Sequence, residues 1–77
     1  MYLTFTLRLR EKGYDIQADS NLPVEKAVQT LCESMRLYEG ISPPALYKSS
    51  QQSRVISSAF TFEQAKIQNG DILAAIE

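Results

Sequence analysis

The chain has 77 residues, 44% of them hydrophobic and 22% charged, which indicates a single folded domain over residues 1–77 with one small core. Eight basic and nine acidic side chains give a net charge of −1, which provides no summed field for binding nucleic acid or anionic lipid. One cysteine and no histidine exclude an internal disulfide and the usual zinc ligand sets, and they indicate a reducing compartment.

No segment predicts a membrane span or a signal peptide. The longest apolar run is Ile72–Ile76, whereas a helix needs roughly 20 apolar residues to cross a bilayer. The N-terminus alternates apolar with polar residues instead of presenting a continuous hydrophobic block. We therefore expect a cytoplasmic protein without direct membrane insertion.

The first 19 residues predict a β-hairpin, because apolar and polar residues alternate on both sides of a break at Arg10–Gly13. Gly13 is expected to take the positive φ that many hairpin loops require. Seven residues should face the core: Leu3, Phe5, Leu7, Leu9, Tyr14, Ile16 and Ala18.

The segment Leu22–Leu37 predicts the main helix, because its apolar residues recur every three or four positions. Pro23 suits the first helical position, and the polar residues 19–21 offer cap oxygens. Gly40 is expected to end the helix. The buried face should consist of Val24, Ala27, Val28, Leu31, Cys32 and Met35.

Four further elements are predicted after the helix and the break at Pro43–Pro44. They are a strand at Ala45–Lys48, a strand at Arg54–Ile56, one helical turn at Thr61–Ala65 and, after the turn signal Asn69–Asp71, a strand at Ile72–Ile76. The first and last strands lie far apart in sequence, so we expect them to pair in parallel at the centre of a mixed five-stranded sheet, with the helix across one face.

This α+β order, β-β-α-β-β-short helix-β, resembles the ubiquitin-like β-grasp fold over nearly the whole chain. Four marks carry the resemblance: the hairpin Leu3–Ala18, the helix from Pro23, the segment Ile41–Pro44, and a tail in which Phe62, Ile67 and Leu73 would close the bottom of the core. Within that fold, the length and the Asn-Gly-Asp turn resemble the YukD-type proteins of Gram-positive type VII (Esx) secretion systems. The resemblance implies a non-enzymatic accessory component that meets a cytoplasmic domain of a membrane-bound secretion apparatus.

The residues offer little for catalysis, so we expect neither an enzyme nor a cofactor. Cys32 has no histidine to act as its base and lies on the apolar face of the predicted helix. Ubiquitin and the sulfur carriers for molybdopterin and thiamine synthesis end in Gly-Gly, whereas this chain ends in Ile76-Glu77. A sulfur carrier or protein modifier is therefore disfavoured as an alternative, and an adaptor unrelated to secretion stays open.

The remaining expectation concerns the open face of the sheet. If Leu73 points inward, the outward residues of the last strand form an apolar surface, unless its end frays or tucks under a loop. We expect this surface to bind a protein partner, and the oligomeric state stays open. The predicted protein-binding residues are Thr6, Arg8, Tyr47, Ala74 and Ile76.

Overall fold

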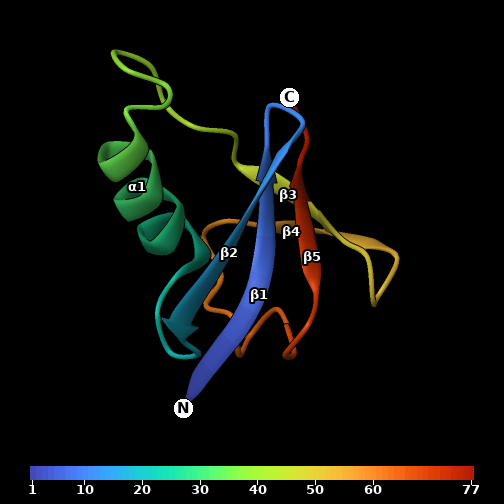
Figure 1. Cartoon of the computed structure of the whole chain (residues 1–77). Helices are drawn as coiled ribbons and strands as arrows, with labels where there is room; N and C mark the ends of the chain where they lie inside the picture. Colours follow the sequence, from blue (N-terminus) through green and yellow to red (C-terminus); the bar gives the residue numbers. More distant parts are fainter.

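A computed structural model describes all residues, Met1–Glu77, as one sheet and one helix (Figure 1). The elements in chain order are β1 (Tyr2–Leu9), β2 (Lys12–Asp19), α1 (Val24–Met35), β3 (Leu46–Ser49), β4 (Arg54–Ser57) and β5 (Ile72–Ala75). The five strands lie in the order β2-β1-β5-β3-β4. The two termini lie at opposite ends of the sheet (Figure 1), because β1 and β5 run in parallel.

The central pairing confirms the predicted topology. In the parallel pair, Leu7 of β1 lies opposite Leu73 of β5, and both side chains are fully buried. The other neighbouring strands are antiparallel: β1 with β2, β3 with β5, and β3 with β4. This is the mixed five-stranded β-grasp sheet that the sequence predicted.

One core lies between the sheet and α1. The predicted inner face of the hairpin is confirmed, since its β1 residues and Ala18 are buried while Tyr14 and Ile16 pack partly buried against the core. The predicted face of the helix is confirmed except at Met35, which is exposed because the helix ends there. Phe62 lies with its ring centroid 4.8 Å from that of Phe5.

The hairpin turn differs from the prediction. Leu9 pairs with Lys12, so the loop consists of Arg10 and Glu11 alone, and both have positive φ (50° and 66°). Two-residue hairpin loops of this kind need positive φ at both positions, because their twist then matches that of the strands. The expectation that Gly13 supplies the positive φ is therefore wrong, since Gly13 lies within β2.

The start of the helix is capped by a distant segment. Pro23 is the N-cap and not the first helical residue, so the helix begins at Val24, one residue later than predicted, and no side chain caps it. The N–H groups of Val24 and Glu25 instead donate to the backbone oxygens of Phe60 and Ser58, each at 2.9 Å. These bonds satisfy donors that every helix start leaves free. The prediction that residues 19–21 supply the cap is thus wrong.

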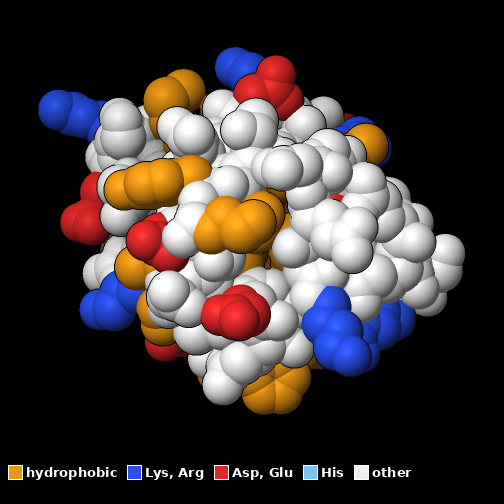
Figure 2. All heavy atoms as spheres, turned by 90° about the horizontal axis from the view of Figure 1, so that it is seen from below, with side chains coloured by type: hydrophobic (Ala, Val, Ile, Leu, Met, Phe, Trp, Pro, Cys, Tyr) orange, Lys and Arg blue, Asp and Glu red, His pale blue; other side chains and the backbone are white.

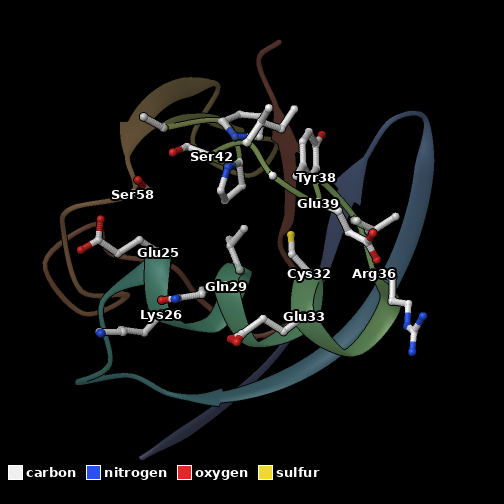
Figure 3. Close-up of a pocket in the computed structure, with 17 residues that line it drawn as sticks. Glu25, Lys26, Gln29, Cys32, Glu33, Arg36, Tyr38, Glu39, Ser42 and Ser58 are labelled. Carbon is white, nitrogen blue, oxygen red and sulfur yellow. The ribbon is translucent and has the colours of Figure 1, made fainter.

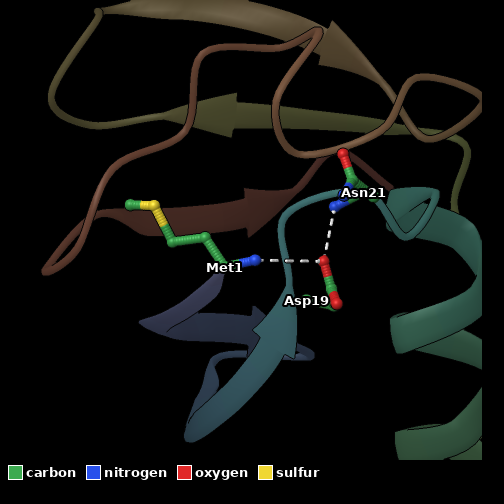
Figure 4. Close-up of polar contacts among 3 residues, drawn as sticks. All are labelled: Met1, Asp19 and Asn21. Carbon is green, nitrogen blue, oxygen red and sulfur yellow. Dashed lines mark hydrogen bonds and ion pairs between the residues drawn. The ribbon is translucent and has the colours of Figure 1, made fainter.

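The carboxylate of Asp19 contacts the N-terminus and Asn21 and does not cap the helix (Figure 4). Its Oδ1 accepts a hydrogen bond from the N–H of Asn21 at 2.9 Å and lies 3.7 Å from the amino group of Met1. The helix ends at Met35, because the C-cap Arg36 has a left-handed φ of 55°, so Gly40 does not end it as predicted.

The segment after β4 forms a hydrogen-bonded turn where one helical turn was predicted. The N–H of Gln64 donates to Thr61 Oγ1 and the N–H of Thr61 donates to Gln64 Oε1, each at 3.0 Å. This reciprocal pair is a capping box. It holds Phe62, Ala65 and Ile67 in the core.

Candidate protein-binding surface

Four of the five predicted binding residues lie on the face of the sheet away from α1. Arg8 lies opposite Ala74 across the parallel pair, Thr6 lies opposite Ile72, and Ile76 follows on the same side of the final segment. Arg8 and Ile76 are exposed, whereas Thr6 and Ala74 are half-buried. The sheet therefore brings these residues onto one surface.

The placement of Tyr47 on that surface is wrong, because its side chain is 0% exposed. Tyr47 lies opposite Ala75 on one side and Ile56 on the other, and both of these residues belong to the core side of the sheet. Its hydroxyl has no hydrogen-bond partner, and burial raises the pKa of Tyr47 far above its usual range. Tyr47 is a core residue.

Leu46 occupies the outward position that the sequence analysis gave to Tyr47. It is 47% exposed, and its backbone oxygen accepts the N–H of Ile76 at 2.9 Å. Ile72 and Ile76 are also exposed, by 38% and 44%. We call the outward apolar residues of β3, of β5 and of the position directly after β5 the open-face patch: Leu46, Ile72, Ala74 and Ile76.

Two cations lie beside the open-face patch. Ala74 pairs with Arg8 on one neighbouring strand and with Lys48 on the other, and both cationic side chains are exposed. The small side chain of Ala74 therefore lies between two positive charges. Such a surface suits a partner that places apolar groups beside a carboxylate.

The end of the molecule that carries the N-terminus is different in character (Figure 2). There the exposed hydrophobic side chains form several small groups, separated by polar and acidic side chains. Scattered apolar groups of this kind are normal on a soluble surface and indicate no site.

A groove of about 660 Å³ lies between α1 and the segment 36–45 (Figure 3). Cys32 lines it, and its sulfur points toward the segment that carries Tyr38. Burial raises the pKa of the Cys32 thiol, against a smaller lowering effect of the Arg10 charge. The thiol is therefore protonated at neutral pH, which makes it a poor nucleophile.

Beside this groove, the side chain of Tyr38 contacts two segments that are distant in sequence. Its hydroxyl donates a hydrogen bond to Glu77 Oε1, and the guanidinium of Arg10 lies 4.2 Å from the centroid of its ring. Burial and this hydrogen bond raise the pKa of Tyr38 to about 12. The hairpin tip, the segment after the helix and the last residue are thus connected, although nothing in the local sequence pattern indicated this role.

This contact predicts an alkaline loss of stability. An unfolded tyrosine ionises near pH 10 and folded Tyr38 near pH 12, so the unfolded chain loses its proton first and the free energy of unfolding falls between these values. The Tyr38→Phe variant keeps the ring and removes the ionisation. Urea unfolding at a series of pH values should show a steeper decrease for the natural chain. If the free energy of unfolding depends on pH in the same way for both proteins, Tyr38 does not have a raised pKa in the folded chain.

Comparison with known proteins addresses the fold. No family model matches the chain, and no curated protein matches its sequence. Among solved structures, the chain is similar to the C-terminal ubiquitin-like domain of mouse tubulin-specific chaperone e, with a TM-score of 0.64 and 19% identity over 96% of this chain and 84% of that chain. This chain has the ubiquitin-like fold. A ubiquitin-like protein from the archaeon Caldiarchaeum subterraneum also matches, with a TM-score of 0.43 and 18% identity over 99% of this chain and 94% of that chain.

The ubiquitin-like fold explains how the open-face patch arises. The helix covers one side of the sheet, and the outward residues of its central strands stay accessible on the other. No group of three or more Cys, Asp or Glu side chains is close enough together to hold a metal ion. The helix α1 has 12 residues, and the structure holds no helix with the length and apolar character of a membrane span.

Proposed function

We propose that this ubiquitin-like chain is a non-enzymatic protein-binding module that docks through its open-face patch. The observation that carries the proposal is the exposure of Leu46, Ile72 and Ile76 around Ala74 on adjacent strands. Exposed apolar patches rimmed by polar residues mark interfaces more often than scattered apolar side chains do. The rigid central strands of the sheet position the patch without a loop rearrangement.

The flanking charges specify the partner's chemistry. Arg8 and Lys48 lie on either side of Ala74, so the partner should present an apolar side chain next to an aspartate or glutamate. The apolar contacts would supply most of the affinity, and the charges would mainly increase the association rate and reject basic partners.

Binding to a partner from the native cell tests this function. We expect the double variant Leu46→Glu, Lys48→Glu to bind a co-purifying partner at least about tenfold more weakly, because it places one carboxylate in the patch and replaces a flanking cation by another. The matched control is Lys26→Glu, which reverses an exposed charge on α1, outside the sheet. The proposal fails if the double variant is folded, by its circular dichroism, and holds the partner as tightly as Lys26→Glu does.

We further propose that the partner is a cytoplasmic domain of a membrane-bound type VII secretion apparatus, and that the chain acts in the cytoplasm. This assignment is supported by the resemblance of the turn Asn69–Asp71 to that of YukD-type proteins. In a cell that exports small helical substrates, the double variant Leu46→Glu, Lys48→Glu should reduce export to the level seen without the protein. Normal export with a folded double variant would rule out this role.

A further inference from the structure

Strand β2 is a free edge of the sheet, and its backbone groups are accessible at alternate residues. The two-residue loop makes Leu9 and Lys12 a pair whose backbone groups are hydrogen-bonded to each other. In an antiparallel hairpin every second pair is bonded in this way, so Tyr14 and Ile16 of β2 also bond to β1. The N–H of Thr6 accordingly points away from β2 and donates to the oxygen of Asp71. It follows that Gly13, Asp15 and Gln17 point their N–H and C=O groups away from β1, toward the outside of the sheet.

A groove of about 490 Å³ runs along this edge, between β2 and α1. It is lined by Ile16 and Ala18 from the core side of β2 and by Gln17 and Asp19 from the open side. Because consecutive residues from both faces line it, the free backbone edge lies in the groove itself. The connection before α1 contributes Leu22, and α1 contributes apolar and small polar residues: Ala27, Thr30, Leu31 and Ser34.

The opposite edge of the sheet lacks these features. Strand β4 has four residues, and the segment after it lies along its start, where Arg54 Nη2 donates to the backbone oxygen of Ala65 at 3.0 Å. The oxygens of Ser58 and Phe60, just beyond β4, bind the start of α1. The edge strand β2 is therefore the longer one, and its backbone groups are the ones accessible for pairing with another strand.

We propose that β2 binds an extended peptide segment of a partner protein as a sixth strand. Main-chain hydrogen bonds to a free edge provide affinity in this binding mode, and pockets for alternate side chains provide specificity. Apolar side chains at alternate positions would enter the groove beside Ile16 and Leu31. The intervening side chains would lie opposite Asp15 and Asp19 on the open side, where opposite charges across a strand pair stabilise it.

The peptide should therefore alternate apolar residues with lysine or arginine. This charge preference is the reverse of that proposed for the open-face patch, which favours carboxylates. The two surfaces can thus be occupied by different segments, and the strand site stands independently of the proposed docking function.

The peptide Val-Lys-Val-Thr-Val-Lys-Val, blocked at both ends, is a direct probe. Its pattern reads the same in both directions, so it tests parallel and antiparallel addition together. In an NMR titration we expect saturable shifts in β2 and α1, and slower amide exchange at Gly13, Asp15 and Gln17. The same peptide with glutamate in place of both lysines should bind at least about tenfold more weakly. Equal binding of the two peptides, no binding, or shifts confined to the open-face patch would overturn the proposal.

Two protein variants sharpen the test. The Gln17→Pro substitution removes an outward N–H from β2 and should reduce peptide binding at least about tenfold, because proline at an edge position blocks strand addition. The matched control, Val55→Pro, changes an outward position of β4 and should bind as the natural chain does. The same affinity for both proline variants would contradict the site.

A charge exchange provides evidence that does not depend on how proline is tolerated. The Asp15→Lys variant should prefer the glutamate peptide to the lysine peptide, which reverses the order seen with the natural chain. An unchanged preference for the lysine peptide would overturn the pairing with Asp15. Self-association of the natural chain through β2 in the absence of peptide, seen as a concentration-dependent increase in mass, would assign the edge to a second copy and overturn the proposal as well.

Discussion

Replacing Phe62 by alanine is expected to unfold most of the chain at room temperature. The ring is 0% exposed and packs against Phe5, so its removal leaves a cavity in the core. Substitutions of this kind cost about 3–5 kcal/mol. A domain of this length has only about 3–5 kcal/mol of net stability from a single core, so the cost of the substitution is comparable with the entire free energy of unfolding. Urea unfolding followed by circular dichroism measures the change.

Phe60 supplies the matched control for that experiment. Its side chain is half-exposed, and only its backbone oxygen binds the start of α1. The Phe60→Ala variant should therefore change the free energy of unfolding by about 0.5 kcal/mol or less. Equal urea midpoints for Phe60→Ala and Phe62→Ala would show that Phe62 does not close the core.

Replacing Asp71 by alanine is expected to destabilise the chain by about 3 kcal/mol. The substitution removes a buried carboxylate, and the donors that bond to it are then left unpaired. One carboxylate oxygen accepts from Ser49 Oγ at 2.6 Å, and the other accepts from the N–H groups of Gln51 and Ile72 at 3.1 and 2.7 Å. These bonds fix the start of β5 against the β3–β4 connection. Urea unfolding of Asp71→Ala measures the loss.

Asp15→Ala is the control for this second substitution. Asp15 is exposed and accepts a single side-chain hydrogen bond, from Thr6 Oγ1 at 2.8 Å. Its replacement should cost no more than about 0.5–1 kcal/mol. If Asp71→Ala unfolds at the same urea concentration as Asp15→Ala, the carboxylate of Asp71 does not hold β5 in place.

The elements that could be predicted from the sequence are those with a long periodic pattern. Strand β1 alternates over eight residues and β2 over residues 14–19, and a one-residue slip would expose the whole apolar set, so the pattern fixes their inner face. The helix repeats its apolar residues over three turns. The parallel pairing of β1 with β5 followed from the long connection between them.

The position of Tyr47 could not be predicted, because β3 has only four residues and two of them, Leu46 and Tyr47, are large and apolar. Alternation alone then allows either residue to face the core. The register with β5 decides, since it places Tyr47 opposite Ala75. The predicted site therefore had the correct face of the sheet and the wrong residue on β3.

Contacts between distant segments account for the other differences. The start of α1 is capped by backbone oxygens at Ser58 and Phe60, which no local sequence pattern reveals. The buried role of Asp71 was hidden for the same reason, because the sequence marks it only as part of a turn. The groove along β2 depends on how α1 crosses the sheet, so it too becomes visible only in the folded chain.

Photo-crosslinking in the native cell tests most directly whether the open-face patch is the docking surface. A photoreactive amino acid is introduced at Leu46, in the patch, or at Gln29, an exposed position of α1. We expect irradiation to join a partner to the Leu46 derivative and to give no such product from the Gln29 derivative. A product from Gln29 alone, with none from Leu46, would contradict the account.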